Sequence, residues 1–217
     1  HFAIIRHLVK FSTSRFIPNY LISPEPLSYP IAFHHYARLF YSLDLYNNPW
    51  LPNFILSILA TFIFMFLSIE ITGGSNSAIL VGFIVYFCVP TNWIFQGPAN
   101  AYIGLSERYM GRIFCSLAYV GITFGSLYEL SDFLIVGILG ASVAFLSSIF
   151  ARQALIFTIP LVSILTLDIT PIICILIAMA VSIILGRSNM IDGWYHTILT
   201  LKLYKTKTKR SSLVRKY

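Results

Sequence analysis

The sequence predicts an all-α protein, a polytopic transmembrane helical bundle with two interfacial amphipathic helices before the first span. The composition supports the first part of that prediction, because 57% of the 217 residues are hydrophobic and only 11% are charged. With a mean hydropathy of +0.78, the chain is too apolar for the surface of a soluble domain. The other two observations are a series of long apolar stretches and the placement of charges between them.

Six apolar stretches are candidates for crossing a membrane, which requires roughly 20 residues. Two of them, 78–90 and 153–167, are short, so each either borrows flanking residues or forms a re-entrant segment. Pro160 predicts a kink or a break inside the second. Tryptophans, among them Trp50 and Trp194, lie just outside the stretches, as in an aromatic belt. The six stretches are 51–72, 78–90, 111–128, 133–150, 153–167 and 170–186.

Charge is segregated along the chain as the positive-inside rule describes. If all six stretches cross, the connectors on one side of the membrane carry only acids, namely Glu70, Glu129, Asp132 and Asp168. The arginines and lysines then gather on the other side, nominally the cytoplasmic one. We therefore expect three regions: interfacial helices and a Pro-rich loop over 1–50, a transmembrane bundle over 51–186, and a basic juxtamembrane tail over 187–217.

The two amphipathic helices are expected over residues 2–14 and 31–46, where apolar residues recur at helical spacing. In the second helix His34 and Arg38 are four residues apart and share a polar face. An imidazole and a guanidinium on one face could together hold a phosphate or pyrophosphate headgroup. The alternative is a polar interfacial face whose side chains snorkel toward water.

The Pro-rich connector SPEPLSYP places Glu25 between two prolines, which keep the backbone extended and stiff. A catalytic acid or base needs such positioning. Alternatively, the prolines only end one interfacial helix and begin the next.

A second connector, TNWIFQGPANAYIGLSERYMGR, brings Arg108 and Arg112 to the start of an apolar helix at positions i and i+4. Two guanidinium groups at this spacing can bind an anionic lipid headgroup, or they can be ordinary juxtamembrane arginines that anchor a helix end. Further along that helix, Gly121 and Gly125 form a small-xxx-small pair, which is typical of helix packing.

Several kinds of site are not indicated. No charged residue lies in the middle of an apolar stretch, which argues against a proton- or ion-coupled pathway. The three cysteines lack metal-binding spacing, and His34 beside His35 is a poor metal pair, so no metal site is predicted. No cofactor is evident, and no residue pattern supports a divalent metal.

The basic tail is preceded by DGWYHTILTLKLY, which predicts an interfacial helix. Such a tail would bind anionic lipid headgroups with about 1 kcal/mol per basic residue near the surface. We expect the lipid bilayer, and not nucleic acid, to be its partner. Because the chain starts at His1 without a leader pattern, we also expect residues missing before His1 and after Tyr217.

The segment HFAIIRHLVKF, the Pro-rich loop and YPIAFHHYARLF ahead of the first span together resemble the first large loop of polytopic GT-C glycosyltransferases. LSERYMGRIFCSL and FARQALIF resemble further parts of bacterial membrane proteins of that kind. The resemblance implies a polyprenyl-phosphate-linked sugar donor and an acidic catalytic base in the first loop. The usual position of that base would lie before His1, which leaves Glu25 as the candidate.

The resulting expectation is an integral membrane glycosyltransferase of cell-surface polysaccharide or glycolipid synthesis, in the bacterial plasma membrane. Glu25 would assist deprotonation of an acceptor hydroxyl, while His34, Arg38, Arg108 and Arg112 hold the donor phosphate. Alternatives are a non-catalytic transporter or flippase component for a lipid-linked saccharide, and a small scaffold subunit. The resemblance places the loop outside the cell, whereas the basic residues favour the cytoplasmic face; a re-entrant 78–90 or 153–167 would separate loop and tail.

Overall fold

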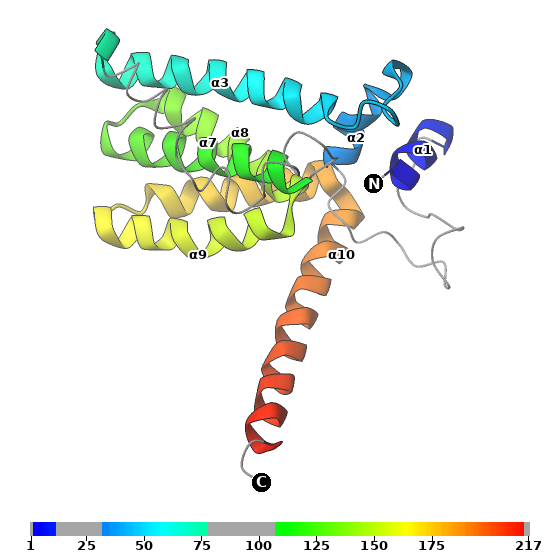
Figure 1. The fold of residues 1–217 in the computed structure, drawn as a ribbon. Coiled ribbons are helices and arrows are strands. Elements are labelled where there is room, and N and C mark those ends of the chain that lie inside the picture. Colours follow the sequence, from blue (N-terminus) through cyan, green and yellow to red (C-terminus); the bar gives the residue numbers. More distant parts are fainter. Residues whose placement is uncertain (1, 12–31, 78–106, 215–217) are drawn as a thin grey trace.

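The computed structural model describes residues 2–11, 32–77 and 107–214, and within these ranges every regular element is a helix (Figure 1). The predicted all-α fold class is therefore confirmed for the described part of the chain. The apolar stretch 78–90 and Glu25 lie outside it. The elements are α1 Phe2–Phe11, α2 Ala32–Arg38, the 3-10 helix η1 Tyr41–Leu43, α3 Leu51–Thr72, α7 Glu107–Leu127, α8 Ser131–Ser147, α9 Ile149–Thr166 and α10 Thr170–Val214.

Four helices of the described part are long and apolar enough to cross a membrane, and the protein is an integral membrane protein. These are α3, α7, α9 and the first part of α10, up to Arg187. Helix α8 is also apolar but has only 17 residues. The sequence-based boundaries agree closely with these helices, and the span predicted over 51–72 coincides with α3.

The long helices lie side by side and alternate in direction from α7 onward (Figure 1). The chain reverses at Ser148 between α8 and α9, and over residues 167–169 between α9 and α10. Helix α10 is interrupted at Arg187, whose φ of 47° and ψ of −135° are not helical. Beyond this kink the helix turns sharply away from the bundle, at the end where α1 and α2 also lie (Figure 1).

The closest helix pair is α7 and α8, which meet through glycines. A Cβ atom added to Gly121 would lie 2.6 Å from the Cα atom of Gly137, and one added to Gly125 would lie 2.7 Å from a methyl carbon of Leu134. Neither position can take a larger side chain without moving the backbones apart. The packing role predicted for Gly121 and Gly125 is confirmed.

Two large apolar clusters, beside a small one around Leu117 and Phe133, hold the described part of the fold together. The larger joins α7, α8, α9 and α10 through residues such as Ile122, Phe145 and Leu155. The smaller lies at one end of the bundle and joins α1 and α2 to the starts of α3 and α7 through residues such as Phe33 and Met110. The interfacial helices are therefore packed onto the bundle.

Two expectations about local structure are decided, and the second was wrong. The stretch 153–167 is lengthened by flanking residues and is not re-entrant, because α9 is continuous through Pro160 and runs from the end of the bundle near α2 to the opposite end. The helix predicted over 31–46 ends at Arg38 and is followed by turns and η1. The hydrogen bonds there run from Leu39 N–H to the Tyr36 carbonyl and from Phe40 N–H to the Ala37 carbonyl, the tight spacing of a helix end.

Candidate basic end of the bundle

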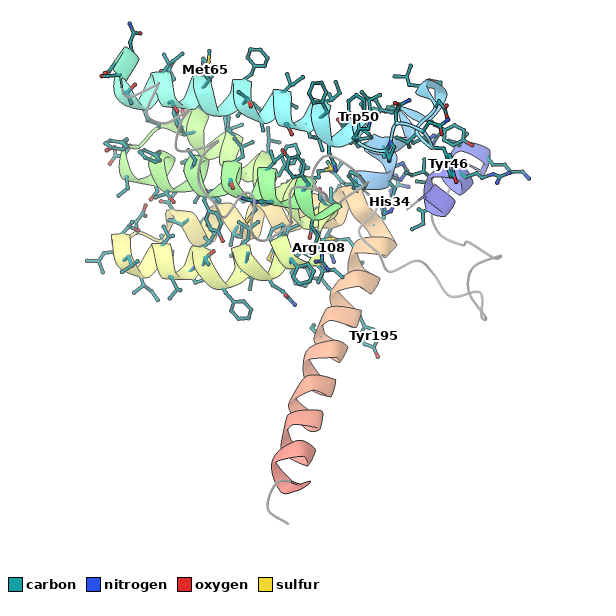
Figure 2. All side chains as sticks on the ribbon, in the orientation of Figure 1. His34, Tyr46, Trp50, Met65, Arg108 and Tyr195 are labelled. Carbon is teal, nitrogen blue, oxygen red and sulfur yellow. The ribbon has the colours of Figure 1, made fainter. Side chains whose placement is uncertain are left out.

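The two ends of the bundle carry opposite charges. Glu70, Glu129 and Asp132 line one cavity at the end where α3 and α7 finish. Asp168 belongs to the same end, because it accepts a hydrogen bond from Ser126 near the end of α7. At the opposite end lie α1, α2 and the start of α7, with His34 and Arg108 on the same side of the molecule (Figure 2). For the described residues the predicted charge segregation is confirmed, and we name these regions the acidic end and the basic end.

Helix α2 brings one of its predicted binding residues inside the protein. His34 is 0% exposed, with its ring centroid 5.8 Å from that of Phe33. The expectation that His34 lies on a polar face is therefore wrong. Helix α2 is covered on one side by α1 and on another by the start of α7 and the end of α8. A second face of this short helix is therefore buried.

Arg38 lies close enough to His35, on the same helix, to influence the pKa of its imidazole. His35 is exposed at the surface, and its pKa is lowered first by partial burial of the ring and then by the positive charge of Arg38. His35 is therefore neutral near pH 7. Tyr36 fixes the helix in place, since its hydroxyl donates to the Pro52 carbonyl at 2.9 Å, and burial raises the pKa of Tyr36 to about 12.

Arg108 and Arg112 lie in the first two turns of α7, which begins at Glu107, so the predicted position of both arginines at the start of this helix is confirmed. Arg108 is exposed, and its guanidinium carbon lies 4.5 Å from the centroid of the Phe150 ring on α9. Arg112 is half-buried. A Cβ atom added to Gly111 between them would lie 2.4 Å from Cβ of Ser148, so α7 lies directly against the turn between α8 and α9.

One arginine of the basic end, which the placement of charges assigns only to this side of the membrane, is enclosed in the protein. Arg152 is 1% exposed, and its Nε atom donates to the Phe145 carbonyl at 2.5 Å. That carbonyl belongs to the last turn of α8, where carbonyls lack a partner within the helix. Arg152 thus caps α8, and a cation is favoured at this end of a helix.

Trp194 covers the buried arginine. The guanidinium carbon of Arg152 lies 5.7 Å from the centroid of the Trp194 ring, a cation–π distance, and the ring packs beside Phe145. Trp194 lies beyond the kink at Arg187, on the part of α10 that turns away from the bundle, and its ring still contacts Phe145 and Arg152 at this end. A sequence signal existed in the FARQALIF segment, because a charged residue flanked on both sides by apolar residues is a candidate for burial.

Two polar atoms of this pair have no hydrogen-bond partner within the described structure. They are Nη1 of Arg152 and Nε1 of Trp194, both buried and both donors. An unpaired buried donor costs about 1 to 3 kcal/mol, and more when it is charged. The basic end therefore has two hydrogen-bond donors that lack a partner in the described structure, next to the start of α9. Ser148, the N-cap residue of α9, makes no side-chain capping hydrogen bond.

The acidic end is built differently. Its cavity of about 700 Å³ is lined by the three carboxylates together with aromatic side chains such as Phe124 and Tyr128, whose rings stack at 5.8 Å. Glu129 and Asp132 are exposed. Asp168 closes the turn before α10 by accepting hydrogen bonds from the Thr170 N–H at 2.9 Å and the Thr170 hydroxyl at 2.8 Å.

The catalytic candidate Glu25 lies outside the described residues, so its position relative to Arg38, Arg108 and Arg112 stays a prediction. Among the described residues, no group of three or more His, Cys, Asp or Glu side chains could hold a metal ion. We compared the chain with family models, curated proteins and solved structures, and none of the three comparisons found a match.

Proposed function

We propose that this protein binds the phosphate of a polyprenyl-linked sugar at its basic end and transfers the sugar in cell-surface polysaccharide or glycolipid synthesis, in the bacterial plasma membrane. The observation that carries the proposal is the position of Arg108 and Arg112. They lie in the first turns of α7, against the α8–α9 turn, at the end that also holds Arg38. Guanidinium groups at a membrane interface suit phosphate, which they bind through paired N–H donors.

In this proposal Arg38, Arg108 and Arg112 hold the donor phosphate and stabilise the charge that develops on it as the sugar leaves. His34 is withdrawn from direct contact with the donor, because its ring is enclosed and positions α2. Glu25 stays the candidate base for an acceptor hydroxyl. The basic tail beyond residue 187 binds anionic lipid and holds this end at the headgroup layer.

The test is donor binding and sugar transfer by the full chain in proteoliposomes that contain a polyprenyl-phosphate-linked sugar. The double variant Arg108→Ala/Arg112→Ala should bind the donor at least about tenfold more weakly, because it loses the charge-assisted hydrogen bonds of two guanidinium groups, each worth roughly 1.5 kcal/mol or more. Arg6→Ala is the matched control, since Arg6 on α1 is exposed at the same end. Equal transfer by the double variant and the wild type would refute the assigned roles.

A transporter or flippase component is the second candidate, and one observation favours it. Residues 32–50, the start of α7 and the part of α10 beyond Arg187 lie at one end, which the positive-inside rule assigns to the cytoplasm. A lipid-linked saccharide made in the cytoplasm would be gripped there before crossing. Donor binding that depends on Arg108 and Arg112 without any sugar transfer would favour this function.

A further inference from the structure

We propose that Arg152 and Trp194 form a buried phosphate-binding subsite, in which Nη1 of Arg152 and Nε1 of Trp194 donate hydrogen bonds to one phosphate group. This inference rests on the proposed function, because it adds two enclosed donors to the arginines that hold the phosphate of the bound lipid in that proposal. It differs from the sequence-based site, which contains neither residue.

The first support is the state of the two donors. Arg152 is 1% exposed, its Nε atom is used by the Phe145 carbonyl, and its Nη1 atom has no partner in the described part of the chain. The indole Nε1 of Trp194 is also buried without a partner. Two neighbouring donors can be satisfied together only by an acceptor, and a phosphate offers several acceptor oxygens.

The second support is the surrounding charge. Arg152 lies in the first turn of α9, whose N-terminal end carries partial positive charge. An anion beside Arg152 would therefore be favoured both by the guanidinium and by the helix. Arg108 reaches the same helix start through the Phe150 ring, so a phosphate bound here has a second cation nearby.

The third support is the position of Trp194 at the edge of the bundle. Its side chain is half-buried, and the adjacent Tyr195 is exposed on the part of α10 that leaves the bundle (Figure 2). The two donor atoms are enclosed behind this edge, so a headgroup that arrives there reaches them when the Trp194 side chain moves. Because Trp194 follows the kink at Arg187, a bound phosphate would also hold this part of α10 against α8 and α9.

The experiment uses the full chain in phosphatidylcholine nanodiscs, titrated with polyprenyl phosphate in one arm and with inorganic phosphate in the other. Arg152→Met keeps an unbranched apolar side chain of similar length and should weaken binding by about tenfold or more. Trp194→Phe keeps an aromatic ring beside Phe145 and should weaken binding by about threefold to tenfold. A response to the lipid alone identifies a headgroup site, and a response to both identifies a general phosphate site; either supports the subsite.

The matched controls are Arg6→Met, which removes an exposed charge from the same end, and Trp50→Phe, which removes an indole from the start of α3. Both should bind as the wild type does. Unfolding of each variant in detergent shows whether a loss of binding reflects a loss of fold. If Arg152→Met does not fold, phosphate binding by Trp194→Phe is the test of the subsite.

Wild-type binding by both subsite variants, or no binding of either phosphate probe by the wild type, would overturn the inference. The outcome is separable from that of the proposed function. Sugar transfer that is unaffected by Arg152→Met and Trp194→Phe would support the transferase function and refute the subsite. Phosphate binding that depends on Arg152 and Trp194, in a protein that transfers no sugar, would leave the subsite and remove the transferase.

Discussion

At the basic end of the bundle the guanidinium of Arg152 is enclosed between α8, α9 and the kinked part of α10, whereas at the acidic end Glu129 and Asp132 are exposed around an open cavity. The two ends also differ in how fully their charged groups are hydrogen-bonded. Asp168 satisfies three donors in its turn, but Arg152 keeps a donor without a partner in the described structure. The carboxylate of Asp168 is satisfied by its own neighbours, whereas the enclosed arginine has a donor left for the proposed phosphate.

The largest change in stability is expected from removing an enclosed polar ring from the basic end. His34→Ala should lower the free energy of unfolding by about 2 kcal/mol or more, because it leaves a cavity between α2 and its neighbours. Chemical unfolding in micelles measures this change. The matched control is His35→Ala on the same helix, which should change stability by less than about 0.5 kcal/mol because His35 is exposed.

Equal effects of the two substitutions would contradict the placement of α2 against the bundle. His34→Ala also separates structure from binding. A variant that unfolds more easily but binds polyprenyl phosphate normally once folded agrees with the interior position of His34. Direct loss of phosphate binding at full stability would instead restore His34 to the binding site that the sequence predicted.

A smaller effect is expected at the acidic end from Asp168→Asn. Hydrogen bonds from Ser126 and from the N–H and hydroxyl of Thr170 lower the pKa of Asp168. A carboxyl group whose pKa is lower in the folded protein stabilises the fold above its unfolded pKa of about 3.9, and this contribution is lost as the pH falls through the folded value. The wild type should therefore lose stability toward the acid side, and Asp168→Asn should show less of this dependence.

The free energy of unfolding is measured at a series of pH values, from neutral down to the lowest pH at which the detergent micelles remain intact. Glu129→Gln is the matched control at the same end, because Glu129 is exposed. It should leave both the stability and its pH dependence close to those of the wild type. An Asp168→Asn variant with the full acid dependence of the wild type would show that the turn before α10 does not rely on this carboxylate.

Much of the architecture could be predicted from the sequence, because apolar stretches of sufficient length have few alternatives to a membrane-spanning helix. The span over 51–72 and the separation of Glu70 and Glu129 from the arginines follow from spacing alone. The end of α2 was predicted too late. The sequence DLYNNPW after it held the signal, since Asp44 adopts a left-handed conformation and accepts a hydrogen bond from the Asn47 side chain.

The candidate site was less predictable, because burial depends on contacts between segments far apart in the sequence. Periodicity places His34 on one face of α2 but does not reveal that α1 and α7 cover that face. The placement of charges likewise assigns Arg152 to the basic side but does not reveal that Trp194, beyond the non-helical Arg187, covers it. Helical spacing therefore predicts which residues share a face and leaves open which face is covered.

The two charged ends of the bundle are expected to face opposite sides of the membrane. Ser42→Cys at the basic end and Ser131→Cys at the acidic end are introduced at exposed positions in a chain whose Cys88 is replaced by Ser, while Cys115 and Cys174 are buried. Labelling with a membrane-impermeant thiol reagent in sealed oriented vesicles should modify the two new cysteines from opposite sides, with Ser42→Cys accessible from the cytoplasmic side. Modification of both from the same side would contradict the account.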